Sequence, residues 1–513
     1  MNITHLLSRS SLLLCASFLL VACATKTPES SLPHVEKQLG ERYPNTSLST
    51  TTPLIIDKPL DLNTAVQTLL TQSPQVRLAL AQLDIANAQQ LQAELISNPH
   101  LSLGALRPED GGRWQLDLGL SQPLLELFTR PLRRQLAQEN LLAVQLRLQA
   151  QLQKLIVKTG NAYYSAVAAQ QHLQVQQQML AATLARQQLA SSLYRAGNMS
   201  ENSFLYYDNE ARRVQQQVKK RERNAREKYL ELLNLIGFDS SKIIVLPTQL
   251  PMLADESFAQ VDLLSQARKD RLDIQILQQQ ISGIDKRRTF TQQENGWRDM
   301  SVGVNAEREF DGKTNLGPEI EFALSVFNRN QGKLAALDAQ YEKLQAQLQQ
   351  ASLDADLEIA QALNQMQSTR EQLALIQTSL QIAEKRVALS NREVNFMLAS
   401  PFELLDIKRQ EIQLAHDYTN ELASYWQART QLELAIGRAI VQVNVDHEEN
   451  HHGMDHSKMN HAEIDHAEMD HAEMDHSEMN HSEMNHSTHE KSVDHQHHQT
   501  EKTADEHEEH QHD

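Results

Sequence analysis

Two long stretches of the chain, 129–237 and 331–437, are rich in Gln, Leu and Ala and poor in Gly and Pro. This composition, with few bulky aromatic residues, is typical of helices that pack against other helices. Each stretch is interrupted once, at 194–205 in the first and at 394–405 in the second. The pattern therefore predicts two pairs of unusually long helices.

The two stretches also end alike, with Leu-Leu-Asn-Leu-Ile before Gly237 and Leu-Glu-Leu-Ala-Ile before Gly437, 200 residues apart. Such self-similarity at a fixed spacing indicates a duplicated structural unit. We expect a first repeat at 61–257 and a second at 258–445, each beginning with a shorter helix, at 61–97 and at 258–295.

Between the short and the long helix of each repeat, apolar and polar residues alternate with a period of two, which predicts β-hairpins with one apolar face. The alternating apolar residues are Leu101, Leu103, Ala105, Leu116, Leu118 and Leu120 in the first repeat, and Met300, Val302, Val304, Ala306, Ile320, Phe322, Leu324 and Val326 in the second. We expect strands of about 9–11 residues, the length that a tilted membrane strand needs. The same alternation also fits a soluble sheet.

Four strands are too few to close a membrane barrel, which has at least about eight strands. An open sheet edge in lipid would leave backbone groups unpaired. If the hairpins lie in a membrane, subunits must pool them, and three copies would supply twelve strands. The segments from Thr129 to Leu193 and from Gln331 to Leu398 would each extend about 100 Å if helical and straight.

The amino terminus carries an apolar run from Leu6 to Ala22 that is too short to be a lasting membrane span and predicts a signal peptide at 1–22. The sequence Leu-Val-Ala at 20–22 followed by Cys23 resembles the lipobox of bacterial lipoproteins, which implies lipidation of Cys23. In such lipoproteins an Asp after the Cys implies retention in the inner membrane, so Ala24 at this position favours the outer membrane. An ordinary cleavage site is the alternative. Residues 23–60 then form an extended, lipidated leader.

The net charge of −18 is concentrated at the carboxyl end: residues 446–513 hold 20 acidic residues and 3 Lys, against 46 acidic and 45 basic residues in the rest of the chain. Without a predominantly basic domain, a nucleic-acid partner is not expected. No catalytic motif stands out, so we do not expect an enzyme. His172 and His416 are isolated in the sequence and are expected at the helix surface.

The acidic segment 446–513 also holds 17 of the 22 His and 6 of the 13 Met, in a five-residue repeat with His first and Met fourth. With almost no aliphatic residues, it is expected to be disordered. Imidazole and thioether side chains suit Cu(II) and Cu(I), so we expect this tail to bind copper, or silver; an acidic solubilising tail is the alternative. The expected ligands are His456, Met459, His461, His466, Met469, His471, Met474, His476, Met479, His481, Met484 and His486. No cofactor is expected to be required.

Several motifs between about 60 and 440 resemble the TolC-like outer-membrane efflux family. They are the duplicated helix–hairpin–helix unit, Tyr194-x-x-Gly197, the terminal Leu-x-x-Ile-Gly, and Phe-Asn-Arg-Asn-Gln-Gly at 327–332. The second interruption is similar to a pattern of the copper and heavy-metal branch. It keeps Asn395, Met397, Phe402, Glu403, Leu404 and Leu405, while Val394 replaces a Tyr and Ser400 a Gly.

This resemblance implies a mainly α fold with membrane β-strands, in which a long antiparallel α-helical tunnel in the periplasm continues a trimeric 12-stranded β-barrel built from four strands per protomer. It implies a homotrimer in the bacterial outer membrane that meets a periplasmic adaptor and an inner-membrane, proton-driven pump. The expected adaptor-contacting tips are Tyr194, Gly197, Asn198, Ser200, Ser400 and Pro401, and the candidates for a gate are Asp208 and Asp406. Solvent-exposed turns and aspartates are the alternatives for these positions.

The sequence thus predicts an outer-membrane exit duct for copper or related cations, with the tail in the periplasm. Two alternatives stay open. One is a duct for organic drugs, and the other is a metal-sequestering lipoprotein whose helices form only a stalk.

Overall fold

The computed structural model describes residues 28–44, 46–48, 58–123, 125–253, 256, 258–294, 300–321 and 326–440. The chain divides into two units, Met1–Val443 and Asn444–Asp513, and only the first contains described residues. The predicted signal peptide at 1–22, Cys23 and every predicted ligand of the tail lie outside the described residues. The first predicted repeat, 61–257, lies in the first unit, and the second, 258–445, lies in it as far as Val443.

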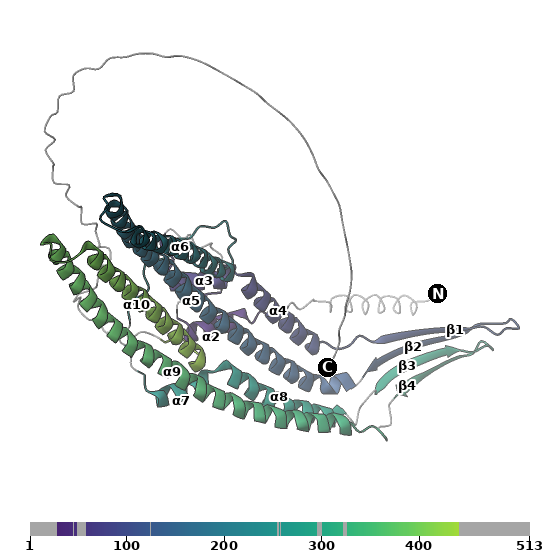
Figure 1. Cartoon of the computed structure of the whole chain (residues 1–513). Helices are drawn as coiled ribbons and strands as arrows, with labels where there is room; N and C mark the ends of the chain where they lie inside the picture. Colours follow the sequence, from purple (N-terminus) through teal and green to yellow (C-terminus); the bar gives the residue numbers. More distant parts are fainter. Residues whose placement is uncertain are drawn as a thin grey trace, which may run out of the picture. The chain divides into compact units, whose positions relative to one another are not determined.

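Four long helices dominate the described part of the chain (Figure 1). They are α5 (Leu125–Arg195), α6 (Glu201–Ile236), α9 (Gln331–Asn395) and α10 (Pro401–Ile436). α5 packs against α6, α9 packs against α10, and α10 also packs against α5. The helices therefore follow one another in the spatial order α6, α5, α10, α9, so that α6 and α9 lie at the two edges of the layer.

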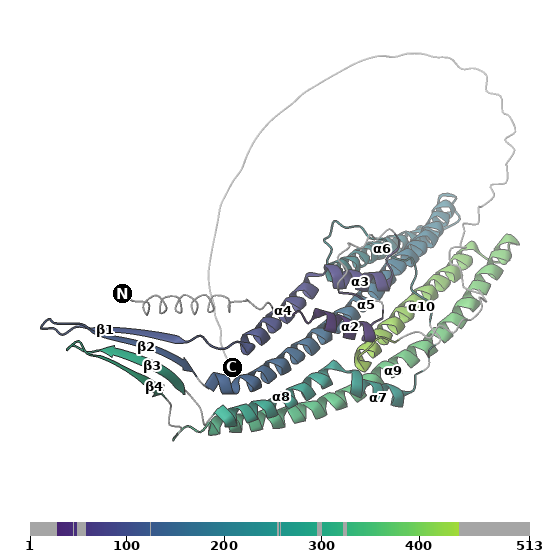
Figure 2. The same ribbon diagram turned by 180° about the vertical axis from the view of Figure 1, so that it is seen from behind.

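Shorter helices precede each long pair: α3 (Leu62–Gln72) and α4 (Pro74–Glu94) in the first repeat, α7 (Gln260–Asp270) and α8 (Leu272–Glu294) in the second. Asp61 caps α3 by accepting a hydrogen bond from the backbone nitrogen of Thr64, and Pro74 separates α3 from α4. α4 packs along α5, and α8 packs against both α5 and α9, as Figure 2 shows from behind.

The leader predicted to be extended contains a helix, α2 (Leu32–Arg42). Its Val35 and Leu39 side chains are buried, and its Arg42 side chain donates hydrogen bonds to the carbonyl oxygens of Asp270 and Gly437. The prediction was wrong here because the Thr-, Ser- and Pro-rich composition around this segment hid two apolar residues with helical spacing. Tertiary contacts with the helix ends stabilise it.

The helices α6 and α10 end in the same way, 200 residues apart. Gly237 and Gly437 end these helices with φ angles of 88° and 85° in the left-handed region. A Cβ atom at Gly237 would lie 2.8 Å from the carbonyl oxygen of Gln72, and one at Gly437 would lie 2.7 Å from that of Asp270. Both positions require glycine, because the backbone conformation and the adjacent carbonyl exclude a side chain.

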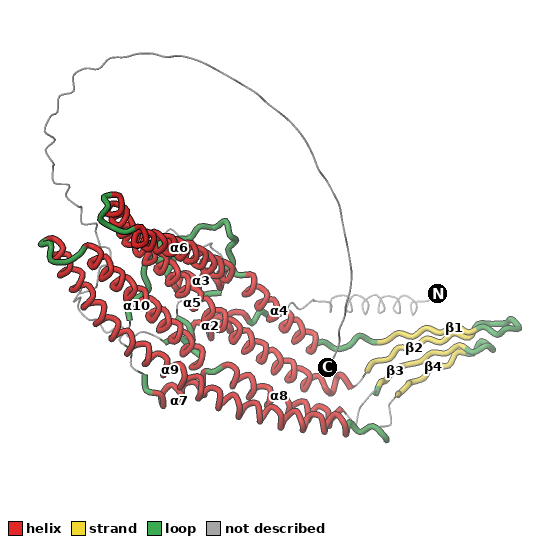
Figure 3. The backbone as a smooth tube through the Cα atoms, in the orientation of Figure 1, coloured by secondary structure: helices red, strands yellow, loops and turns green. Residues whose placement is uncertain are grey.

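The strands β1 (His100–Leu106), β2 (Gln115–Pro123), β3 (Ser301–Arg308) and β4 (Thr314–Glu321) form one antiparallel sheet in that order, shown in yellow in Figure 3. β2 has 9 residues, as predicted, whereas β1, β3 and β4 have 7 or 8 and are shorter than predicted. The second hairpin turns near Gly312, and β4 starts earlier than the predicted alternation. Residues 322–325 lie outside the described residues, and Val326 is in a bend.

A large part of the buried core lies where the short helices meet the long ones. Tyr425, Leu432 and Ile436 of α10 are almost fully buried there. Trp426 stacks on Tyr164 with ring centroids 5.4 Å apart, and its indole nitrogen donates to the carbonyl oxygen of Pro251 at 2.9 Å. This aromatic contact fastens the second repeat to α5 of the first.

Candidate functional site

One face of the sheet is apolar except near its ends, where it carries Gln122, Arg308 and Thr314. Directly opposed residues share a face, and the register pairs Leu103 with Leu118, Leu118 with Ala306, and Ala306 with Leu316. Leu103 and Leu316 are each 75% exposed. The same face carries Leu101, Leu116, Leu120, Val302, Val304, Pro318 and Ile320. A continuous apolar surface of this kind marks a contact with lipid or with protein.

The opposite face is polar and acidic. It carries Asp117 opposite Glu307, and also Glu319 and Glu321. Glycines separate these side chains at 104, 119, 303 and 317. A Cβ at Gly303 would lie 2.7 Å from the carbonyl oxygen of Leu120. An acidic face with small residues suits a water-filled space better than a packed core.

The outer edges of the sheet belong to β1 and β4, and neither edge pairs with another strand among the described residues. The sheet is therefore open. In an apolar environment each unpaired backbone group on these edges would be costly, so the edges need partners that one copy of the chain does not provide.

At the ends of the long helices farthest from the strands, two turns join α5 to α6 and α9 to α10. The first turn places Gly197 at φ 74°, and the backbone nitrogen of Asn198 donates to the carbonyl oxygen of Leu193 at 2.8 Å. Ser200 caps α6 by accepting from the backbone nitrogen of Ser203. Tyr194 stacks on Phe204 with an angle of 4° between the rings.

The second turn has the same hydrogen-bond pattern, because the backbone nitrogen of Leu398 donates to the carbonyl oxygen of Glu393 at 2.8 Å. Here the left-handed residue is Met397, at φ 58° and 94% exposed. A non-glycine residue in this conformation is strained. Ser400 caps α10 and Pro401 occupies its first turn. Met397 thus takes the place in the second turn that Gly197 takes in the first. All six predicted tip residues lie at these two turns, and Gly197, Asn198 and Ser200 are turn or capping residues of the first.

Behind the tips, four charged side chains join the two repeats: Arg186 of α5, Glu210 of α6, and Asp406 and Arg409 of α10. We call them the tip network. Arg409 contacts Glu210 at 2.8 Å and Asp406 at 3.5 Å, while Arg186 contacts Glu210 at 3.5 Å and Asp406 at 3.7 Å. Each of the two arginines therefore contacts both carboxylates, and the four side chains connect three helices.

An aromatic contact supports the tip network. Tyr207 of α6 stacks on Phe402 of α10 with ring centroids 5.0 Å apart, and the guanidinium carbon of Arg186 lies 5.2 Å from the centroid of Tyr207. The sequence did not predict the roles of Arg186, Glu210 and Arg409, because their spacing along the chain does not show that three helices meet at these residues.

The two aspartates predicted as gate residues have different surroundings. Asp406 belongs to the tip network and so contacts another repeat. Asp208 accepts hydrogen bonds from Arg212 of its own helix at 2.9 Å and from Gln187 of α5 at 3.3 Å. The hydrogen bond from Arg212 lowers the pKa of Asp208. Asp208 stays within the first repeat, so only Asp406 can couple the repeats directly.

The model of the outer membrane efflux protein family matches residues 65–238. This outer membrane efflux match covers most of the first repeat, from the first turn of α3 to the residue after Gly237. No curated protein sequence matches the chain.

Solved channel structures share the fold over most of the chain. CusC is 16% identical and aligns over 76% of this chain and 96% of its own, with a TM-score of 0.59. VceC from Vibrio cholerae is 18% identical over 74% of this chain and 96% of its own, at 0.59. The CmeC outer membrane channel of Campylobacter jejuni is 13% identical over 77% and 92%, at 0.61. At such low identities the likeness establishes the fold, and the predicted fold class is confirmed.

A third contact between the repeats corrects the prediction for two histidines. His172 of α5 is only 7% exposed, and its ring lies 4.3 Å from that of His416 of α10. Arg221 of α6 lies 3.0 Å from the Nε2 atom of His416. Burial, with His416 and Arg221 nearby, lowers the pKa of His172 to about 4. The prediction of two isolated surface positions failed because helix packing joins residues 244 apart in sequence.

Within the described part of the chain, no group of three or more His, Cys, Asp or Glu is arranged to hold a metal ion. None of the helices in those same ranges is both long and apolar enough to cross a membrane. The predicted metal ligands all belong to residues that the structure does not describe.

Proposed function

We propose that the chain is a subunit of an outer membrane efflux channel in which three copies pool their strands into a barrel of twelve. The observation that carries this proposal is the sheet, with an exposed apolar face, an acidic face and two unpaired edges. In a closed ring, β1 of one copy pairs with β4 of the next, the apolar face meets lipid, and the acidic face lines the pore.

The edge helix α9 supports association along the helices as well. Its exposed apolar residues recur at spacings that keep them on one face of the helix. Leu375 is 70% exposed and Leu357 is 60% exposed; Leu353, Ile382 and Leu389 belong to the same stripe. Closing the layer α6–α5–α10–α9 into a tube would cover this stripe with α6 of the neighbouring copy.

The oligomer and its stripe can be tested together. We expect purified protein to be a heat-resistant trimer in native mass measurements. The double variant Leu375→Glu and Ile382→Glu should weaken it, because each substitution buries a charge at the interface. The matched control is Gln381→Glu, which adds a charge at an exposed position of the same helix that lies outside the stripe. A stable, water-soluble monomer would overturn the channel proposal and leave a stalk.

For the cargo, we propose copper or related cations. The support is chemical: His and Met alternate in register in the tail, and the acidic face of the sheet favours cations over anions. The test compares bacteria with the intact gene, a deletion, and a version ending at residue 445. Copper sensitivity on deletion is the expected result. Sensitivity to organic drugs without any change in metal tolerance would replace this cargo with the drug alternative.

Two further parts of the proposal concern attachment and partners. We propose that Cys23 carries lipid, and mass measurement of the mature amino-terminal peptide, with Cys23→Ser as control, tests this. We also propose that the two tips contact a periplasmic adaptor linked to an inner-membrane pump. Site-specific crosslinkers at Asn198 and Ala399 should capture such a partner, whereas crosslinkers at Ser241 near the opposite end of α6 should not.

A further inference from the structure

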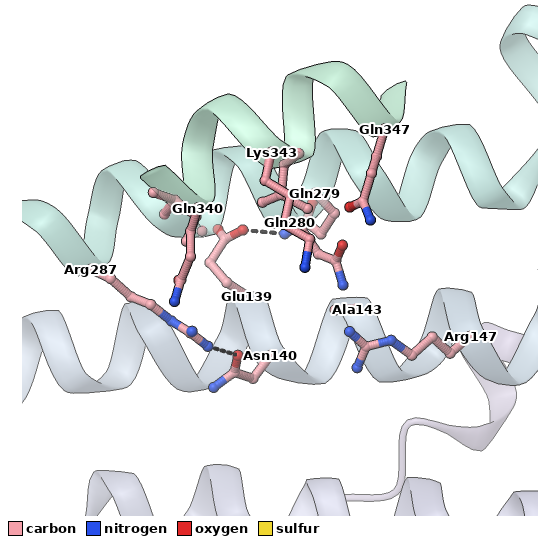
Figure 4. A pocket seen from close by; sticks show the side chains of 13 residues that line it. Glu139, Asn140, Ala143, Arg147, Gln279, Gln280, Arg287, Gln340, Lys343 and Gln347 are labelled. Atoms are coloured by element: carbon pink, nitrogen blue, oxygen red, sulfur yellow. Dashed lines mark hydrogen bonds between the residues drawn. The ribbon is translucent and has the colours of Figure 1, made fainter. Parts of the chain in front are cut away.

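A cavity of about 400 Å³ opens between α5, α8 and α9, in the half of these helices next to the strands (Figure 4). It is distinct from the tips, the tip network and the faces of the sheet. Residues 139–147 of α5, 279–287 of α8 and 340–347 of α9 line it. The proposed channel assigns no role to this cavity.

The lining has an apolar part and a part rich in amides. Ala143 and Ile284 are buried and form the apolar part together with Leu344. The amide groups of Gln340 and Gln347 project from α9 into the space between the helices, as Figure 4 shows. Such a lining offers both an apolar contact surface and hydrogen-bond donors and acceptors.

The charges of the lining are unbalanced. Its one carboxylate, Glu139, already forms an ion pair with Lys286 and accepts a hydrogen bond from Gln279. Among the described residues, Arg147 of α5 and Lys343 of α9 make no hydrogen bond and no ion pair, yet both line the cavity from different helices. Arg287 adds a third cation, although it also donates to the side-chain oxygen of Asn140 at 3.2 Å.

A glycine keeps one wall open. Gly283 lies in the middle of α8, where glycine is unfavourable compared with alanine. A Cβ atom at this position would meet no other atom within 4 Å. Close packing therefore does not require a glycine here, and its consequence is free access to the cavity.

We propose that this cavity binds a small organic anion, a carboxylate with an apolar body. Arg147 and Lys343 attract the charged group, the glutamine amides bind its oxygens, and Ala143 and Ile284 receive the apolar part. A metal cation does not fit, because Glu139 is already paired and the two free cations repel it. Since the cationic groups are exposed, the affinity is modest, with a dissociation constant on the order of 1 mM.

The experiment uses the full-length protein in detergent, with benzoate as the probe and ligand-observed NMR titration as the measurement. Benzyl alcohol and benzylamine have the same ring without the negative charge, and sulfate has the charge without the ring. We expect benzoate to bind at least tenfold more tightly than each of them. Equal binding of benzyl alcohol or sulfate, or no benzoate binding, would overturn the proposal.

Two variants locate the site. The double variant Arg147→Gln and Lys343→Gln should weaken benzoate binding at least tenfold, whereas Lys333→Gln, an exposed residue on α9 outside the cavity, should not change it. Gly283→Leu should fill the open wall and abolish binding while keeping the fold, because its side chain meets open space and leucine favours helices. The matched control is Gly332→Leu, also in open space. Benzoate binding unchanged in the double variant or in folded Gly283→Leu protein would exclude this site.

Discussion

The helices α6 and α10 occupy equivalent places in the two repeats but have opposite chemistry. Residues 212–228 of α6 contain eight Lys or Arg and two Glu, whereas residues 412–428 of α10 contain no Lys or Arg and two acidic residues. α10 lies between α9 and α5 and buries Tyr425 and Trp426. α6 lies at the edge and, over the same span, buries little more than Val214 and Val218.

This difference teaches that two helices with the same place in the chain order and the same type of helix end can have different roles. The inner copy, α10, supplies the packing that holds the protomer together. The outer copy, α6, keeps its long polar side chains in solvent and remains free for contacts with other molecules. Substitutions at pairs of positions 200 residues apart can therefore test the two roles directly.

The largest effect is expected at Trp426 and its counterpart Arg226. Trp426→Ala removes the stacking on Tyr164 and the hydrogen bond to Pro251 and leaves a cavity, at a cost of about 3–5 kcal/mol. Arg226→Ala removes an exposed side chain and should cost less than about 1 kcal/mol. Denaturant unfolding of both variants measures the difference. Similar losses in the two would mean that α6 is packed as tightly as α10.

The next largest effect is expected at the glycines that end α6 and α10, where the two repeats are alike. Gly237→Ala and Gly437→Ala each place a Cβ within 3 Å of a carbonyl group in a left-handed conformation, so each should cost about 1–3 kcal/mol. Gly283→Ala is the control, and it should stabilise by about 1 kcal/mol because α8 leaves that position open. The same unfolding assay applies, and clearly unequal losses at 237 and 437 would contradict the structural equivalence of the helix ends.

The two repeats also differ at His172, whose counterpart is Gln372, and this difference should make the free energy of unfolding depend on pH. The folded-state pKa of His172, about 4, lies below the ordinary histidine value, so the folded state resists protonation. Stability is therefore full above about pH 6.5 and declines by up to about 1 kcal/mol per pH unit as pH falls toward 4. His172→Gln, the residue of the second repeat, should flatten unfolding free energies measured between pH 7 and 4. An unchanged slope would assign the decline to other groups.

The smallest effect on stability, about 1 kcal/mol, is expected in the tip network, but it has a functional readout. Arg409→Gln removes contacts with both Glu210 and Asp406, which loosens α10 from α6 and should raise single-channel conductance in planar bilayers several-fold. Asp406→Asn should have a weaker effect of the same sign. Asp208→Asn should change conductance least, because Asp208 has no partner in the second repeat. An equal or larger effect of Asp208→Asn would shift the gate to the first repeat.

The sequence alone was sufficient for features that depend on local periodicity. Gly237 and Gly437 revealed the duplication because a left-handed helix end needs glycine, and alternation of Leu with Gly and Ser revealed the two faces of the sheet. Contacts between distant helices could not be predicted in this way. His172, Arg186 and Arg409 meet their partners only because α5 and α10 pack at a certain rotation, and no short-range pattern records that rotation.

The second tip shows another limit. The sequence drew attention to Ser400, where the family pattern has a glycine, yet the left-handed backbone occurs at Met397, where a helix-forming residue gives no warning. Tertiary and turn geometry decided this position against local preference. The leader helix α2 is a similar case, since its buried Val35 and Leu39 and its contacts with Asp270 and Gly437 stabilise a helix that is short by itself.

The unpaired rims of β1 and β4 also matter before the protein reaches its destination. A newly made copy exposes two rows of unpaired backbone groups together with an apolar surface. This combination promotes aggregation with other extended chains. We therefore expect cells that produce this chain to need chaperones that keep it soluble in aqueous compartments. Its yield should depend more on chaperone capacity than on the stability of its helices.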